Sequence, residues 1–339
     1  MKYKYALIDT ANTFFRARHV AARNTDLSEK IGMALHLTLA SVNMAVRNYG
    51  IDHVVFCLEG RSWRKDVYAP YKRNRIVDQA TVTEAEKEES EMFWKVYEEF
   101  TTYLKERTNV SVLRHEHAEA DDLIARFIHL HPDDNHWIIS TDTDYDQLIT
   151  EKVVRYNGVG NELVTLKGYL NDKGQVIKDK KTKEPKLLED PKYLLFRKCL
   201  RGDSSDNIFS AFPGIREKGS SKKAGIKETY EDKDKQGYTW TNTMLQRWTD
   251  HEGVEHRVLD DYKRNVALID LTAQPQEIKE KVDARIISDV NIANKPQVGI
   301  HFMKFCGKYE LTKISQNAET FSKWLGSPYQ GKLHESHSA

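Results

Sequence analysis

Short apolar runs recur along the first half of the chain, and most of them end in an acidic or polar residue. They lie at Tyr3–Asp9, Ile51–Glu59, Val110–Leu113, Trp137–Ser140 and Val153–Tyr156. Short apolar runs of this kind are typical of buried strands. Between them, apolar residues recur at helical spacing within Leu27–Tyr49, and a further helix is expected to begin near Glu119. Strands that alternate with helices predict an α/β fold, with a mainly parallel central sheet flanked by helices.

The pattern changes after the fifth predicted strand. Residues 158–190 are rich in Gly, Asn and Lys, and this stretch follows no apolar periodicity. Within it, Leu163–Leu166 and Gln175–Ile177 are candidates for a hairpin around Asn171–Gly174. We interpret the whole stretch as a solvated surface ribbon, in preference to a binding element.

Helical spacing returns at Tyr193–Leu200 and at Leu259–Leu271, on either side of a polar, Gly- and Lys-rich region. This spacing predicts a second, smaller helical domain. We therefore expect an α/β domain at 1–190, a helical domain at 191–290 and a C-terminal extension at 291–339. The last residues, Gly326–Ala339, are polar and unpatterned, so they are expected to fray.

Composition adds limits to this picture. The chain has 339 residues, of which 39% are hydrophobic and 30% charged, and its formal net charge is +1. No apolar run approaches the roughly 18 residues of a membrane span, and the start reads as a strand, not a signal peptide. The three cysteines lie far apart, so we expect reduced thiols and a cytoplasmic, monomeric protein without membrane partners.

Carboxylates follow four of the predicted strands. They are Asp9 after the first, Glu59 after the second, Glu119, Asp121 and Asp122 after the third, and Asp142 and Asp144 after the fourth. Two more, Asp203 and Asp206, lie in the turn sequence Gly202–Asn207. Individually, such acids are also explained by helix starts and turns. Together they point to one edge of the sheet, where hard oxygen ligands suit Mg²⁺ or Mn²⁺ and where two cations would serve phosphodiester hydrolysis.

Cationic residues follow the second predicted strand directly. They are Arg61, Arg64, Lys65, Lys72, Arg73 and Arg75, with Trp63, Tyr68 and Tyr71 interleaved. Cations neutralise backbone phosphates and aromatic rings stack on bases, so this stretch is a candidate nucleic-acid contact. A second candidate is the segment Phe212–Lys223, which carries Gly214, Lys218, Lys222 and Lys223. Its glycines allow backbone amides to approach a phosphate, although a flexible basic loop has the same composition.

In this order, the pieces resemble the flap endonuclease and 5′-nuclease family, which includes phage 5′ exonucleases and RNase H, and the 5′-nuclease domain of bacterial DNA polymerase I. The resemblance rests on Leu7–Asp9 with Asn12, Tyr71–Arg75, Glu119–Asp122, Ser140–Asp144, and Gly202–Asn207 with Pro213–Ile215. It implies a PIN-like domain, a helical arch near 61–95 and a helix–three-turn–helix element that grips duplex DNA. Two divalent metals, Mg²⁺ or Mn²⁺, would be held by the nine acids above. Lys72 would reach the scissile phosphate, with Arg75 beside it.

Three positions depart from the family pattern. Glu59 stands where the family has Asp, so its contact with a metal is expected to run through water. Arg216 replaces the family's second glycine, which leaves open whether K⁺ binds there. The ribbon at 158–190 is longer than in the phage members. Asp146 continues the acidic run but matches no family ligand, so we expect a surface or capping role for it.

The function that we expect is cleavage of 5′-flap, nicked or RNA-primed DNA by a two-metal mechanism in phage replication. RNA–DNA hybrids are expected substrates, and a polymerase or single-strand-binding protein is a possible recruiting partner. A PIN-type ribonuclease acting on single-stranded RNA and a non-catalytic protein that binds branched DNA are the alternatives. A haloacid-type phosphatase is disfavoured because Asp9 is followed by Thr10 and Ala11, without its Asp-x-Asp pair.

Overall fold

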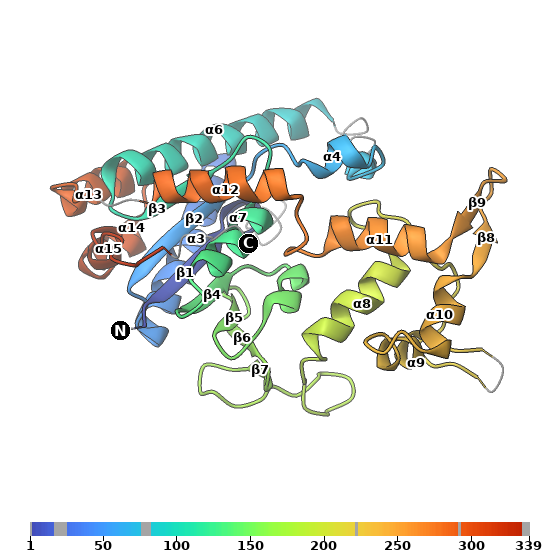
Figure 1. Ribbon diagram of the computed structural model, residues 1–339. Helices are drawn as coiled ribbons and strands as arrows, with labels where there is room; N and C mark the ends of the chain where they lie inside the picture. The colour runs from blue at the N-terminus through green and yellow to red at the C-terminus, as the bar shows by residue number, and fades with distance from the viewer. Residues whose placement is uncertain (1, 17–25, 76–82, 221–222, 291–292, 334–339) are drawn as a thin grey trace. The chain divides into compact units, whose positions relative to one another are not determined.

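The computed structural model describes residues 2–16, 26–75, 83–220, 223–290 and 293–333. The chain forms two compact units, and each is assembled from separate stretches of sequence. The sheet unit comprises Met1–Arg61, Val82–Leu188 and Gln276–Ala339, and the helical unit comprises Ser62–Thr81 and Glu189–Pro275. Figure 1 labels the helices and strands of both units.

A seven-stranded sheet forms the centre of the sheet unit, in the order β3-β2-β1-β4-β5-β6-β7. The strands are β1 (Lys4–Asp9), β2 (His53–Leu58), β3 (Ser111–Arg114), β4 (Asn135–Ile139), β5 (Val153–Asn157), β6 (Glu162–Thr165) and β7 (Gly168–Leu170). The first five pair in parallel, with Leu7 opposite Val55 on one side and Ile138 on the other. All six residues of β2 are buried, because helices cover both faces. The predicted α/β fold with a mainly parallel sheet is confirmed.

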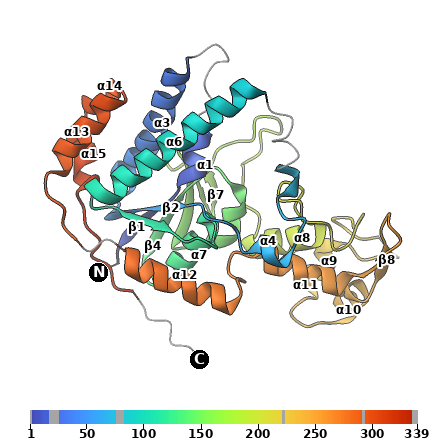
Figure 2. The same cartoon turned by 90° about the horizontal axis from the view of Figure 1, so that it is seen from above.

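Helices lie on both faces of this sheet, as Figure 2 shows from above. One face carries α1 (Thr10–Phe15), α3 (Leu27–Tyr49) and α6 (Glu84–Arg107); the other carries α7 (Ala120–Leu130) and α12 (Gln276–Asp289). The helices α13 (Val298–Lys308), α14 (Thr312–Ser315) and α15 (Ala318–Leu325) pack outside α3 and α6. The helix α3 spans the predicted range, since Asp26 caps its start and Gly50, at a φ of 63°, ends it.

The C-terminal part of the chain belongs to the sheet unit, contrary to the continuous helical domain expected at 191–290. Val282 and Ile286 of α12 are fully buried, and α12 packs on α7 and β3. Beyond α15, Ser327 and Tyr329 are also held: the Ser327 carbonyl accepts from the His53 ring at 3.1 Å, and Tyr329 is 8% exposed. The frayed end predicted from Gly326 is therefore wrong as far as Tyr329, and residues 334–339 lie outside the described part.

The ribbon is a short antiparallel extension of the sheet. β6 and β7 pair as a hairpin, with Leu163 opposite Leu170, so the tight turn lies at 166–167. The turn predicted at Asn171–Gly174 is present, where the Asn171 carboxamide accepts from the backbone amides of Lys173 and Gln175. It joins Leu170 to Val176 through a single bridge. The predicted pairing of Leu163–Leu166 with Gln175–Ile177 is therefore wrong. The segment contains two turns, and β6 pairs with β7 across the first of them.

The helical unit is built on α8 (Pro191–Arg201) and α11 (Val258–Ile269), which pack on each other. Its other elements are α4 (Arg64–Val67), α9 (Ile226–Glu231), α10 (Tyr238–Met244) and the hairpin β8 (Arg247–Thr249) with β9 (Glu255–Arg257). Phe196, Cys199 and Leu200 form its core with Tyr71, which comes from far earlier in the chain. Between α8 and α9, the described residues 202–220 and 223–225 form turns and irregular loops, with one bridge between Asp203 and Ile208.

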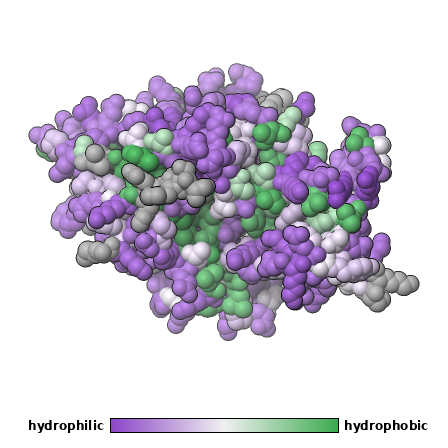
Figure 3. Space-filling view, viewed as in Figure 1, coloured by the Kyte–Doolittle hydropathy of each residue, from purple (hydrophilic) through white to green (hydrophobic). Residues whose placement is uncertain are grey.

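Hydrophilic residues cover most of the face drawn in Figure 3. Among the described helices, none combines the length and the apolar character that crossing a bilayer requires. The three cysteines are free and buried, in agreement with the expected reduced thiols.

Candidate active site

Asp9 lies at the end of β1 and is only 5% exposed. Its Oδ2 accepts hydrogen bonds from the Ser140 hydroxyl at 3.0 Å and from the Tyr145 hydroxyl at 3.2 Å. Its Oδ1 accepts from the Asn12 backbone amide at 3.2 Å, which caps α1. The carboxylate is thus fixed by donors from the ends of two adjacent strands, β1 and β4.

The acids at the other strand ends lie around the same point. Burial raises the pKa of Asp9 to about 6, and the charge of Asp142 adds to this effect against the hydrogen bonds that lower it. Burial also raises the pKa of the Tyr145 hydroxyl, and nearby carboxylates raise it further. These are Asp9, Asp121, Asp142 and Glu59. Carboxylates that follow four different strands therefore all lie near the Tyr145 hydroxyl. This agrees with the expectation that these acids meet at one edge of the sheet.

The start of α7 contributes three of the acids. Glu119, Asp121 and Asp122 each have one carboxylate oxygen within 4.8 Å of the others. Asp122 is fully buried, and its Oδ2 accepts from the Glu119 backbone amide at 3.2 Å, as a helix cap does. Glu59 at the end of β2 reaches the same helix start, because its Oε2 accepts from the Ala120 amide at 3.2 Å. Asp122 thus has a structural role as well as a place in the cluster.

After β4 the chain forms a short 3₁₀ helix, Thr143–Leu148, which positions the next two acids. The Asp142 Oδ1 caps it by accepting from the Asp144 amide at 2.9 Å. Asp146 differs from its expected surface role. It is 4% exposed and pairs with buried Arg155, with Nε and Oδ1 2.6 Å apart. Arg155 is close to Asp146 in the sequence, but it lies on β5 and meets Asp146 only in the folded chain. The acidic run by itself therefore did not predict this pair.

The helical unit brings Asp206 together with both predicted catalytic cations. Its carboxylate accepts from Arg75 Nη2 at 2.9 Å and from the Tyr71 hydroxyl at 3.1 Å, and Lys72 Nζ lies 3.6 Å away. Lys72 has a φ of 53°, a left-handed conformation that is costly for a residue with a side chain. Sequence reasoning placed these residues in separate roles, as metal ligand and phosphate contacts. In this structure they are ion-paired with one another.

Asp203 is the second acid of the helical unit. It lies 2.7 Å from Lys198 Nζ, and its Oδ1 accepts from both the amide and the hydroxyl of Ser205. Burial opposes ionisation, but Lys198 and Ser205 outweigh it and lower the pKa of Asp203. Asp203 is therefore held in its charged form, as a metal ligand has to be.

Two of the predicted nucleic-acid contacts are structural residues. Arg64 is 1% exposed and donates from Nε to the Leu268 carbonyl at 2.8 Å, and Tyr71 is 3% exposed within the core. Neither is available to a phosphate or a base in this structure, because each is buried in the core of the helical unit. The other described candidates are half-buried or exposed: Arg61, Lys65, Arg73, Gly214, Lys218 and Lys223. Lys222 lies outside the described residues.

Gly214 has a φ of 75°, a conformation that favours glycine. Further along the same segment, the Glu228 carboxylate accepts from the amides of Gly219 at 2.9 Å and Gly225 at 2.8 Å. A Cβ on Gly225 would lie 2.5 Å from the Gly219 nitrogen, so the two turns approach too closely for other residues. Sequence reasoning missed Glu228, because only the folded loop brings its carboxylate to these amides.

The sequence also matches a known protein family. Residues 4–182 match the family model described as the 5′-3′ exonuclease, N-terminal resolvase-like domain. The chain belongs to this family. That match covers β1 to the ribbon, and therefore all seven candidate ligand acids of the sheet unit.

This 5′-3′ exonuclease family member is similar to two characterised proteins. It is 27% identical over 206 residues to the flap endonuclease of Escherichia phage T5, covering 60% of this chain and 63% of that protein. It is 25% identical over 333 residues to DNA polymerase I of Rhizobium leguminosarum, covering 91% of this chain and 28% of that protein. The chain thus spans less than two thirds of the length of either relative.

Solved structures agree at the level of the fold. The phage T5 5′-exonuclease with bound zinc has a TM-score of 0.57 at 22% identity, covering 84% of this chain and 99% of that one. A complex of the phage T5 flap endonuclease with DNA and metal ions has a TM-score of 0.56 at 22% identity. Its match covers 84% of this chain and 98% of the phage protein.

Proposed function

We propose that this protein is a divalent-metal-dependent nuclease that hydrolyses phosphodiester bonds near 5′ ends in flap, nicked or RNA-primed DNA. The observation that carries the proposal is the group of carboxylates around Asp9 and Tyr145, delivered by four strand ends. Membership of the 5′-3′ exonuclease family supports it, as do a relative named flap endonuclease and a phage T5 structure that contains DNA and metal ions.

The residues present fit divalent cations. All the donors are carboxylate oxygens, the ligands that Mg²⁺ and Mn²⁺ prefer. Burial, and to a smaller extent the charge of Asp142, raise the pKa of Asp9, and a bound cation would favour its ionised form. In the sheet unit, Asp9, Asp121, Asp142 and Glu119 would hold such ions, with Asp144 and Glu59 beside them. Bound divalent ions would supply an activated water and positive charge for the phosphate.

The protein's own residues would orient the substrate. Ser140 and Tyr145 hold the Asp9 carboxylate in place, so it requires little reorganisation when a ligand arrives. In the helical unit, Lys72 and Arg75 form ion pairs with Asp206, and they carry the positive charge that a scissile phosphate requires. The exposed Lys218 and Lys223 are suited to a duplex backbone.

The test is digestion of end-labelled 5′-flap, nicked, RNA–DNA hybrid and single-stranded RNA substrates with Mg²⁺, with and without EDTA. We expect cleavage of the first three, none with EDTA, and none by the double variant Asp142→Asn with Asp144→Asn, which should still bind DNA without metal. The matched control is Asp133→Asn with Asp172→Asn, since both acids are exposed. Normal flap cleavage by the active-site variant would overturn the proposal, and cleavage of single-stranded RNA alone would favour a ribonuclease.

A further inference from the structure

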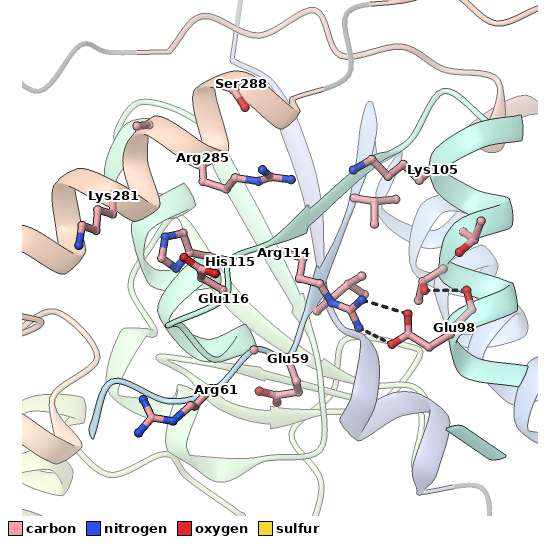
Figure 4. A pocket seen from close by; sticks show the side chains of 16 residues that line it. Glu59, Arg61, Glu98, Lys105, Arg114, His115, Glu116, Lys281, Arg285 and Ser288 are labelled. Carbon is pink, nitrogen blue, oxygen red and sulfur yellow. Dashed lines mark hydrogen bonds and ion pairs between the residues drawn. The ribbon is translucent and has the colours of Figure 1, made fainter. Parts of the chain in front are cut away.

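A pocket of about 1050 Å³ lies within the sheet unit, beside the candidate active site. Its walls come from the ends of β2 and β3, the C-terminal half of α6 and one side of α12 (Figure 4). Glu59 lines it and also belongs to the carboxylates around Tyr145. The pocket and the acid cluster therefore share a residue.

The lining is rich in positive charge. Five cationic residues line this space, against three acidic ones; the cationic residues are Arg61, Lys105, Arg114, Lys281 and Arg285. In Figure 4, Lys105 of α6 and Arg285 of α12 extend toward one another from opposite walls, and the guanidinium of Arg114 on β3 points toward Glu98. Like charges that converge in this way repel each other, which a bound anion would relieve.

Three of these cations have carboxylate partners, all of which lie on the walls and not between Lys105 and Arg285. Glu98 pairs with Arg114, at 3.0 Å and 2.5 Å between its two oxygens and the guanidinium, on the α6 side. Arg285 Nε bonds Asp289 within its own helix at 2.6 Å, and Lys281 Nζ bonds exposed Glu277 at 2.7 Å. Among the residues that the structure describes, none forms an ion pair with the Lys105 ammonium.

His115 belongs to the same lining. Burial lowers its pKa, and the charges of His117, Arg285 and Lys281 lower it further against the opposing effect of Glu116. The pocket is larger than a single phosphate needs, and arginine forks suit phosphate oxygens through paired hydrogen bonds. A chain of phosphates that passes Glu59 would thus meet several donors in succession.

We propose that this pocket binds phosphate groups of the single-stranded 5′ segment of the strand that is cut. The proposal rests on the proposed nuclease function, because that function brings such a segment to Glu59. The phosphates could be those of the backbone or the terminal 5′-phosphate, and both offer the same chemistry.

The test compares a pocket variant, Lys105→Gln with Arg285→Gln, with a matched control, Arg107→Gln with Lys279→Gln. Each pair removes one Lys and one Arg from α6 and α12, and Lys105 and Arg107 share the last turn of α6. Binding is measured by fluorescence anisotropy in EDTA, over a range of salt concentrations. The DNA probes, labelled on the template strand, are a flap with a 5′-phosphate, a flap with a 5′-hydroxyl, and a nicked duplex without a flap.

We expect the pocket variant to bind both flaps about 10- to 100-fold more weakly, with a salt slope shallower by about 1 to 2. Its affinity for the nicked duplex, and all affinities of the control, should match the wild type. A greater loss for the phosphorylated flap would assign the pocket to the terminal phosphate, and equal losses to the backbone.

Flap binding equal to that of the control, or an equal loss on the nicked duplex, would overturn the proposal. Cleavage of the nicked duplex by the wild type with Mg²⁺ is measured separately. If the wild type does not cleave this duplex, the proposed nuclease function is overturned. The comparison of flap binding between the pocket variant and the control does not depend on cleavage, so it still tests the pocket.

Discussion

Arg126 and Asp283 form a bidentate ion pair inside the sheet unit. Nε lies 2.7 Å from Oδ1 and Nη2 lies 2.6 Å from Oδ2, and each side chain is 8% exposed. Arg126 is in the middle of α7, whose N-cap and first turn carry three acids of the candidate site, and Asp283 is in α12. This pair therefore joins the helix of the acid cluster to the helix that forms one wall of the basic pocket.

Replacing Asp283 by Ala should lower the free energy of unfolding by about 3–5 kcal/mol, because it leaves the Arg126 guanidinium buried without its partner. Urea unfolding measures this loss. The control is Glu277→Ala, which breaks the exposed pair with Lys281 and should leave the free energy of unfolding nearly unchanged. The double variant Arg126→Met with Asp283→Leu should recover most of the stability. A small loss in Asp283→Ala would mean that α12 is held by apolar packing alone.

Replacing Asp9 by Asn should stabilise the metal-free protein while abolishing cleavage. The pKa of Asp9 is about 6 in the folded chain, above the usual value of 3.8. The folded state thus binds the proton more tightly, and ionisation costs stability as the pH rises through that window. At pH 7.5 in EDTA we expect a gain of about 1–3 kcal/mol in thermal or urea unfolding. Excess Mg²⁺ should stabilise the wild type and not the variant, and a less stable metal-free variant would contradict the account.

Two buried histidines predict loss of stability in acid. Burial lowers the pKa of His53 to about 4 and that of His136 to about 3. In the unfolded chain both take up a proton near pH 6.5, so stability is lost as the pH falls from about 6.5 toward 3. Neither ring nitrogen of His136 has a hydrogen-bond partner among the described residues, and the ring stacks on Tyr5 at 5.8 Å.

The variant His136→Phe should therefore be more stable than the wild type at pH 5 by about 2 kcal/mol, relative to their difference at pH 8. Urea unfolding at the two pH values provides the measurement. His251→Phe is the control, because the His251 side chain is 90% exposed. If both variants show the same dependence on pH, the acid sensitivity arises elsewhere.

Replacing Lys72 by Ala should slow single-turnover cleavage by about 10²- to 10³-fold, because a charge aimed at the phosphate acts mainly in the transition state. DNA affinity in EDTA should change only a few-fold. The comparison is Lys65→Ala, also in the helical unit and exposed, which should weaken binding more than cleavage. Equal losses in rate and affinity for Lys72→Ala would make this lysine a simple phosphate anchor.

Much of the sheet unit could be predicted from the sequence. The strands and α3 follow from apolar runs and helical spacing, which depend on local geometry. The position of the acids at strand ends was enough to expect them together, since parallel strands release the chain at one edge. The same reasoning missed Ser140 and Tyr145 as the holders of Asp9, because polar residues within an acidic loop have no periodic signal.

Only the tertiary structure decided which residues that are far apart in the chain lie close together. Arg64 looked like a surface cation until its partner, the Leu268 carbonyl, was known. Lys105 and Arg285 belong to helices with no sequence relation, yet they line one pocket. The sequence by itself determined which faces are apolar and where the acids leave the sheet, because both are local properties. Packing decided which charges are buried, paired or brought together, because that depends on which distant segments share a surface.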